Sequence, residues 1–142
     1  MINLSNGVPG VNGPEPRNSE EFYAFYLSQH LHPKTRIAHV VGVTLGVGFL
    51  VAAVVTMQPW LLLGLPVSSY AFAVPAHFIW EGNRPALTNG AAAFVWSIRA
   101  DARQALRFWT RRIDADVAAV RAALGLRDDE VTLADAAARL AA

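Results

Sequence analysis

The chain has 142 residues, of which 54% are apolar and 16% charged, and its formal net charge is +1. This length fits one domain, and a nearly neutral charge gives no general case for a nucleic-acid partner. The sequence contains no cysteine, which excludes disulfides, thiolate zinc sites and cysteine nucleophiles. Charge is also segregated, because no Lys, Arg, Asp or Glu occurs between Ile37 and Trp80. Such segregation indicates membrane insertion.

The N-terminal part combines a segment rich in glycine and proline with one short helix. We expect residues 1–17 to be a disordered leader without a signal peptide, because the segment has no apolar face whose burial could offset its ordering entropy. Asn18 and Glu21 have the spacing of a capping box, and aromatic residues follow at helical intervals. A helix of about twelve residues is therefore predicted from Asn18, ending before Pro33.

Two uncharged stretches, 37–57 and 60–80, are predicted to form a membrane hairpin with a turn at Gln58 and Pro59. At 1.5 Å per residue each leg is roughly 26–29 Å long, close to the thickness of the hydrocarbon core of a bilayer. The rival interpretation is a buried helix pair in a soluble bundle.

Glycines and prolines modify both legs of this hairpin. Gly42 and Gly46 form a small-xxx-small pair that permits close approach of another helix, although membrane helices also tolerate glycine without such a role. Pro66 and Pro75 predict a kink or an unwound turn in the second leg. Pro75 lies two residues before His77, so irregular backbone is expected beside a candidate functional residue.

Basic residues on both flanks of the hairpin set its orientation. They are Arg17, Lys34 and Arg36 before it and Arg84, Arg99, Arg103, Arg107, Arg111 and Arg112 after it. The positive-inside tendency then places both termini in the cytoplasm. We expect an integral, multi-pass protein of a bacterial inner membrane, surrounded by membrane lipids. Whether it forms a homo-oligomer is left open by the sequence.

Two helical regions are predicted after the hairpin. Residues 91–110 form an amphipathic helix that either lies in the cytoplasmic membrane interface or carries a solvated arginine stripe. Residues 113–142 form an alanine-rich tail of two helices broken around Gly125, the second capped by Thr132. The expected fold class is all-α: a membrane helical hairpin, within a domain at 18–112, with flanking interfacial and cytoplasmic helices.

All four histidines fall at the open end of the hairpin. His30, His32 and His39 lie where the first leg begins, and His77 lies where the second leg ends. Because the two legs have similar lengths, the hairpin returns His77 to the level of the other three. Ionisable groups near a membrane core are costly and usually functional, so the pattern predicts a metal site.

His77 and Glu81 are four residues apart and share one face if the helix continues past Trp80. An imidazole and a carboxylate, joined by imidazoles from a second helix, are a ligand set of ferrous oxygenases that keep open positions. Zinc accepts the same ligand types. The simpler interpretation of His77 and Glu81 is a hydrogen-bonded pair on one helix.

Two motifs resemble those of the 2-hydroxy fatty acid dioxygenase family, which consists of small multi-pass membrane proteins. The family pattern has a histidine, a proline three residues on and a second histidine six beyond that, as at His30, Pro33 and His39. It later has His-x-x-x-Glu-x-x-Arg-Pro-Ala, which matches residues 77–86. The resemblance covers about residues 22–110. His32 departs from the pattern, because the family usually has a small polar residue, often Asn, before the proline.

The resemblance implies a dioxygenase of lipid metabolism that uses Fe2+ and dioxygen to shorten 2-hydroxy fatty acids by one carbon in fatty acid α-oxidation. Carried over by position, it implies metal ligands at His30, His39 and His77. His32 and Glu81 are further candidate ligands.

Glu81 and Arg84 are the candidate catalytic residues under this resemblance. Glu81 would bind the metal or hydrogen-bond one of the imidazoles. Arg84 would neutralise the carboxylate of the substrate or pair with Glu81, or it would only anchor the helix end at lipid phosphates.

Two other functions are compatible with the same residues. In a haem protein, His39 and His77 would supply two axial imidazoles, which leaves His30 and Glu81 without a role. In a structural membrane protein without enzymatic activity, the histidines would only cap helices and contact lipid.

Overall fold

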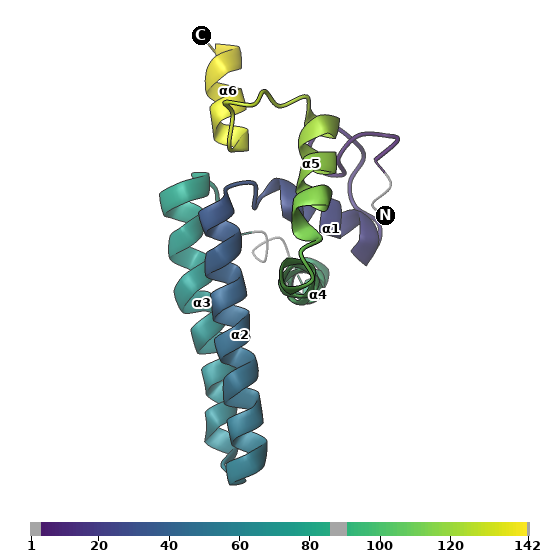
Figure 1. The fold of residues 1–142 in the computed structure, drawn as a ribbon. Helices are drawn as coiled ribbons and strands as arrows, with labels where there is room; N and C mark the ends of the chain where they lie inside the picture. The colour runs from purple at the N-terminus through teal and green to yellow at the C-terminus, as the bar shows by residue number, and fades with distance from the viewer. Residues whose placement is uncertain (1–3, 86–90, 142) are drawn as a thin grey trace.

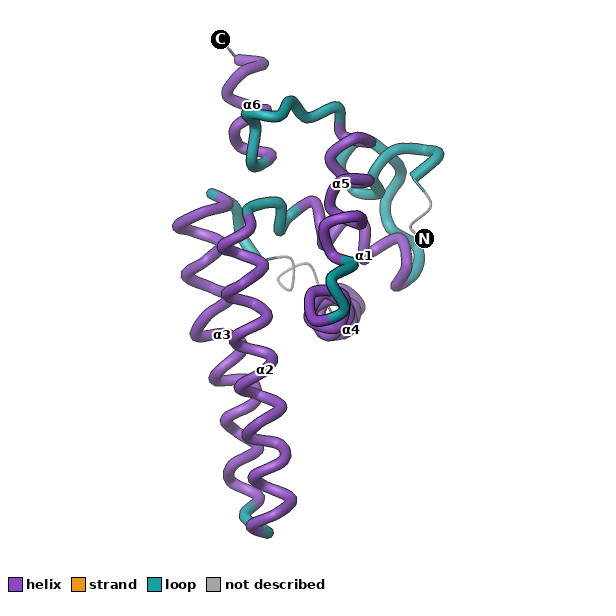
Figure 2. Tube along the Cα trace, viewed as in Figure 1, coloured by secondary structure: helices purple, strands orange, loops and turns teal. Residues whose placement is uncertain are grey.

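The computed structural model describes residues 4–85 and 91–141. Ala86, the last residue of the second motif, therefore lies outside the described residues. Within the described ranges every regular element is helical, which confirms the all-α class (Figures 1 and 2). The α-helices are α1 (Ser19–Ser28), α2 (Pro33–Thr56), α3 (Gly64–Ala76), α4 (Ala91–Trp109), α5 (Ile113–Leu124) and α6 (Leu133–Ala141).

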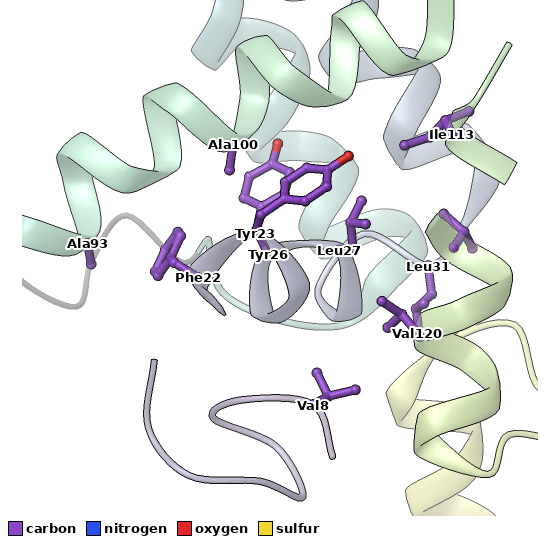
Figure 3. Close-up of a cluster of buried hydrophobic side chains, with 11 residues drawn as sticks. Val8, Phe22, Tyr23, Tyr26, Leu27, Leu31, Ala93, Ala100, Ile113 and Val120 are labelled. Atoms are coloured by element: carbon purple, nitrogen blue, oxygen red, sulfur yellow. The ribbon is translucent and has the colours of Figure 1, made fainter. Parts of the chain in front are cut away.

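Helix α1 forms where the sequence predicts a helix, and it is the centre of the buried core. The Asn18 side chain accepts hydrogen bonds from the backbone N–H groups of Glu20 and Glu21, at 3.0 and 2.9 Å, and so caps the helix. Figure 3 shows the rings of Tyr23 and Tyr26 directed toward α4. The core comprises Val8, Phe22, Tyr23, Tyr26, Leu27, Leu31, Ala93, Ala100, Ile113, Val117 and Val120.

The segment before α1 differs from the expected disordered leader. From residue 4 onward it forms a series of turns, and the Val8 side chain is fully buried in the core (Figure 3). The Val8 backbone N–H donates to the Asn12 side chain at 2.7 Å, and the Asn12 amide donates to the Ala123 carbonyl at 2.9 Å. One buried valine and one bridging asparagine thus attach a segment that its glycine and proline content alone would leave unfolded.

The first leg of the hairpin begins at Pro33, four residues earlier than predicted. Proline is favourable at the first position of a helix, and the His32 side chain caps this end by accepting the Lys34 backbone N–H at 3.1 Å. Because α2 starts here, His39 lies within its first two turns.

The second leg, Pro59–Glu81, is interrupted as its prolines predict. It begins with a 3₁₀ turn, continues as α3 and ends in a π-helical turn, His77–Glu81, directly after Pro75 and Ala76. Pro66 lies in the first turn of α3, directly after the 3₁₀ turn Pro59–Leu63. The irregular backbone is therefore confined to the two ends of the leg, and one of those ends carries His77.

Gly42 and Gly46 let the two legs of the hairpin pack closely. A Cβ atom at Gly42 would lie 3.0 Å from the Ser68 carbonyl oxygen and 3.0 Å from the Ser69 Cα. The Ser68 hydroxyl donates to the Gly42 carbonyl at 3.1 Å across the same contact. The small-xxx-small pair is thus a packing face between α2 and α3.

Most of the hairpin surface is apolar and exposed. Pro33–Thr56 and Pro59–Glu81 are long and apolar enough to cross a membrane, and only 33% and 22% of their apolar windows are buried. Val55, for example, is 75% exposed. A core helix of a soluble protein would be mostly covered, and monomeric soluble proteins rarely expose apolar patches of this extent. Figure 1 shows the hairpin extending well beyond the other helices.

Helix α4 lies beside the open half of the hairpin and crosses it steeply (Figure 1). Its buried side, with Ala93, Ala100 and Gln104, packs toward the core. The opposite side exposes an apolar stripe formed by Val95, Ile98, Leu106 and Trp109. The predicted amphipathic helix is confirmed. Its apolar stripe, however, faces away from the core and is exposed.

The tail is helical and broken at Gly125, as expected. Gly125 has a φ of 65°, a left-handed conformation that favours glycine and ends α5. The Thr132 hydroxyl accepts the Asp135 backbone N–H at 3.2 Å at the start of α6, in the predicted capping role.

Candidate metal centre

Three buried histidines from three separate parts of the chain meet beside α4. His30 follows α1, His39 lies near the start of α2, and His77 begins the π-helical turn at the end of the second leg. One nitrogen of each ring lies within 4.8 Å of one nitrogen of each of the others. The Nε2 atoms of His30 and His39 are 3.1 Å apart. Within the described residues, these three side chains form the group that could hold a metal ion.

Hydrogen bonds at the outer nitrogens determine where the rings of His30 and His39 carry their protons. His30 Nδ1 lies 2.5 Å from the Tyr26 carbonyl oxygen, and His39 Nδ1 lies 2.9 Å from a carboxylate oxygen of Asp101. A carbonyl and a carboxylate can only accept hydrogen bonds, so each Nδ1 must donate. The lone pairs of both rings are therefore on the Nε2 atoms, which face each other.

The same argument applies to His77. Its Nδ1 lies 2.7 Å from the Asn83 side-chain oxygen. The orientation of the Asn83 amide is fixed, because its nitrogen donates to the backbone and side-chain oxygens of Gln29 at 3.2 and 3.0 Å. Asn83 therefore presents its oxygen to His77, whose Nδ1 donates and whose Nε2 is left with a free lone pair.

Three converging lone pairs repel one another unless a cation lies between them. Burial, and next the neighbouring His39 and His77, hold the pKa of His30 well below its ordinary value, so a proton is a poor candidate for this cation. Neutral imidazoles whose Nδ1–H groups are hydrogen-bonded are the usual form of histidine metal ligands. Imidazole nitrogen suits iron, zinc, copper and nickel, and the donor set fits such an ion.

His32 lies outside the cluster. Its ring caps α2 and stacks on Trp80 with a centroid separation of 6.2 Å and an interplanar angle of 14°. Burial, followed by the charges of Lys34 and Arg36, lowers the pKa of His32. These contacts hold the His32 ring at the start of α2, away from the three converging rings.

The other two sequence candidates also lie away from the three rings. The Glu81 carboxylate accepts the His32 backbone N–H at 2.7 Å and does not join His77. Glu81 lies one turn farther toward the open end of the hairpin, at the start of α2, where the positive end of the helix dipole favours a carboxylate. Arg84 is exposed, and it is not among the residues that line the cavity described next.

A cavity of about 330 Å³ opens beside the histidines, between the hairpin and α4. Its polar end carries the three histidines, Tyr26 and Asp101, and Asp101 is the only acidic residue among the described residues that line it. Lys and Arg are absent from the lining formed by residues 4–85 and 91–141. Farther along the hairpin the walls are largely apolar and include Val43, Val47, Leu65, Pro66, Ala73, Val74, Phe94, Ile98 and Ala102.

Sequence reasoning missed Asp101, Tyr26 and Asn83 as partners of the histidines. A signal for Asp101 was present, because it follows Phe94 and Ile98 at helical spacing and so interrupts an apolar side of α4 with a carboxylate. Burial, followed by the charge of Asp101, raises the pKa of Tyr26 well above its ordinary value, so its hydroxyl keeps its proton.

Comparison with known proteins adds one finding. A family model described as 2-hydroxy-palmitic acid dioxygenase Mpo1-like matches residues 17–113, which is more than half of the chain and includes the three histidines, Asn83 and Asp101. No curated protein and no solved structure matches. The chain belongs to the 2-hydroxy-palmitic acid dioxygenase Mpo1-like family.

Proposed function

We propose that this protein is a membrane-embedded dioxygenase that uses ferrous iron to shorten 2-hydroxy fatty acids by one carbon. The observation that carries the proposal is the convergence of three buried imidazoles whose Nδ1 atoms are all hydrogen-bonded outward. Family membership supplies the reaction class. Together they favour an oxygenase over a protein whose histidines only cap helices.

Three imidazoles would hold the iron and leave coordination positions open on its remaining side. Bound ferrous iron would supply the dioxygen chemistry. It would also be the cation that the 2-hydroxy carboxylate chelates. The described residues that line the cavity include no Lys or Arg that would serve as another cation for the carboxylate. In this proposal His30, His39 and His77 bind the metal.

The apolar part of the cavity would hold the acyl tail. His39 and Val47 both line it and are eight residues apart on α2, so the cavity follows the hairpin for about 12 Å. Val47 is 51% exposed and Ile98 is 55% exposed, so the walls end on the apolar surface of the protein. A fatty acid could thus enter from the bilayer without crossing water.

The membrane arrangement proposed here places the hairpin across the bilayer and α4 in its cytoplasmic interface. The exposed apolar stripe of α4 supports this placement, and Arg99 beside it is exposed as well. Both termini would then lie on the cytoplasmic side, and the three histidines would lie near the membrane surface.

Glu81 and Arg84 have supporting roles in this proposal. Glu81 would hold the turn that carries His77 against the backbone of His32, through the 2.7 Å hydrogen bond between them. Arg84 is exposed next to Pro85, which lines the cavity, and would attract anionic head groups to that end.

A haem centre has less support from the geometry. The ring centroids of His39 and His77 are 5.3 Å apart, and the His30 ring lies 4.4 and 4.6 Å from them. A porphyrin placed between His39 and His77 would collide with His30.

The reaction can be tested with protein purified anaerobically in detergent, loaded with ferrous iron and exposed to 2-hydroxypalmitate and air. We expect mass spectrometry to detect a fatty acid one carbon shorter. Palmitate without the 2-hydroxyl group serves as the matched control and should give no product, because it lacks the second chelating oxygen. Equal turnover of palmitate and 2-hydroxypalmitate would contradict the proposed reaction. So would the absence of any turnover of 2-hydroxypalmitate by iron-loaded protein.

A further inference from the structure

A single carboxylate oxygen of Asp101 connects the histidine cluster to α4. It lies 2.9 Å from His39 Nδ1 and also accepts the Tyr26 hydroxyl at 2.9 Å. The side chains of His39 and Asp101 are only 7% and 20% exposed. No other residue of α4 is hydrogen-bonded to one of the three histidines in the described part of the chain.

The geometry points to Asp101 as a positioning residue that fixes the tautomer and orientation of His39, with Tyr26 holding Asp101 in place. The inference rests on the proposed metal site. It adds to that site a fourth residue, which is distant in sequence from both histidine motifs and would act on the metal only through His39.

The tautomer follows from a short count of donors. A neutral imidazole has one N–H, which can be on Nδ1 or on Nε2. The Tyr26 hydroxyl also lies 3.1 Å from His39 Nδ1, but its one proton is engaged by Asp101. Both neighbours of His39 Nδ1 therefore offer only lone pairs, and Nδ1 must carry the proton. The lone pair at Nε2 is then directed at His30 and His77.

The charge of Asp101 acts in the same direction. A carboxylate bonded to the outer nitrogen of a histidine ligand makes the ring a stronger base and a better ligand. Among the described residues Asp101 is the one acidic side chain that lines the cavity, so its charge would partly offset that of a divalent cation held by three neutral rings. Removing it should weaken metal binding without removing any ligand.

The test measures cobalt(II) affinity by competition with a chelator, and it measures the tautomer of His39 in metal-free protein by ¹⁵N NMR. Asp101→Ala should weaken cobalt binding 10- to 100-fold, the usual effect of removing such a partner. Asp101→Asn should lose less, because its amide oxygen can still accept from both His39 and Tyr26. Asp128→Ala, which removes an exposed carboxylate, should bind like the wild type.

The double variant Tyr26→Phe with Asp101→Ala covers the case in which Asp101→Ala alone folds poorly. It also removes the tyrosine hydroxyl, which in the single variant still lies within hydrogen-bond distance of His39 Nδ1 and could take over part of the role of Asp101. This double variant should also lose 10- to 100-fold in cobalt affinity. If instead it binds cobalt as tightly as the wild type, the inference is overturned.

The two measurements separate this inference from the proposed metal site. Wild-type protein that binds no cobalt, iron or zinc would contradict the metal site. An Nε2-protonated His39 in the wild type, or unchanged cobalt affinity in Asp101→Ala, would contradict the role of Asp101 even if the metal site stands. An Nδ1-protonated His39 together with weakened cobalt binding in Asp101→Ala would support it.

Discussion

Replacing His77 with alanine should lower the rate of product formation by about 1000-fold or more, which corresponds to about 4 kcal/mol of lost transition-state stabilisation. The variant loses one of three nitrogens that converge within 4.8 Å, and the described lining of the cavity contains no fourth imidazole. The measurement is the initial rate with 2-hydroxypalmitate under iron-loaded conditions, followed by mass spectrometry.

The fourth histidine of the chain provides the matched control. His32 caps α2 through its side chain and lies outside the cluster, and asparagine is an equally good cap. His32→Asn should therefore retain turnover within about twofold, a free-energy change of about 0.4 kcal/mol. A loss of activity in His32→Asn as large as that in His77→Ala would mean that the site is not the three-histidine cluster.

Replacing Gly42 with leucine should destabilise the hairpin by about 2–3 kcal/mol, because the added side chain has no space. Its Cβ alone would lie 3.0 Å from backbone atoms of Ser68 and Ser69. The backbone of a packed helix cannot move aside as a flexible side chain can. Separation of α2 from α3 would also move His77 away from His39. The free energy of unfolding in detergent micelles measures the effect.

Gly48 offers a control within the same helix. No atom lies within 4 Å of a Cβ built at Gly48, so leucine there meets open space. Gly48→Leu should change the free energy of unfolding by less than about 1 kcal/mol, and in the stabilising direction, because leucine favours helix more than glycine does. Equal destabilisation by both variants would show that α2 and α3 do not pack through Gly42.

Much of the fold could be predicted because it depends on patterns local to each helix. The capping residues Asn18 and Thr132, the break at Gly125 and the interrupted backbone near Pro75 all follow from single residues or short spacings. The meeting of His30, His39 and His77 follows from helix length, since two legs of similar length return the chain to its starting level.

The parts that could not be predicted depend on contacts between distant segments. The burial of Val8 depends on Asn12 bonding to Ala123, a partner that no local pattern identifies. Asp101 reaches His39 only because α4 packs beside the hairpin.

The different place of Glu81 has a similar origin. The four-residue spacing between His77 and Glu81 is compatible with a shared metal site. The spacing alone does not reveal that the Glu81 carboxylate accepts a hydrogen bond from the His32 backbone N–H instead.

The iron content of the protein tests the three-histidine site most directly. After anaerobic loading with ferrous iron and removal of unbound metal, wild-type protein should retain about one iron per chain, and so should His32→Asn. His77→Ala should retain little, because two imidazoles alone bind a divalent metal weakly. No retained iron in the wild type, or undiminished iron in a variant that lacks His30, His39 and His77, would contradict the account.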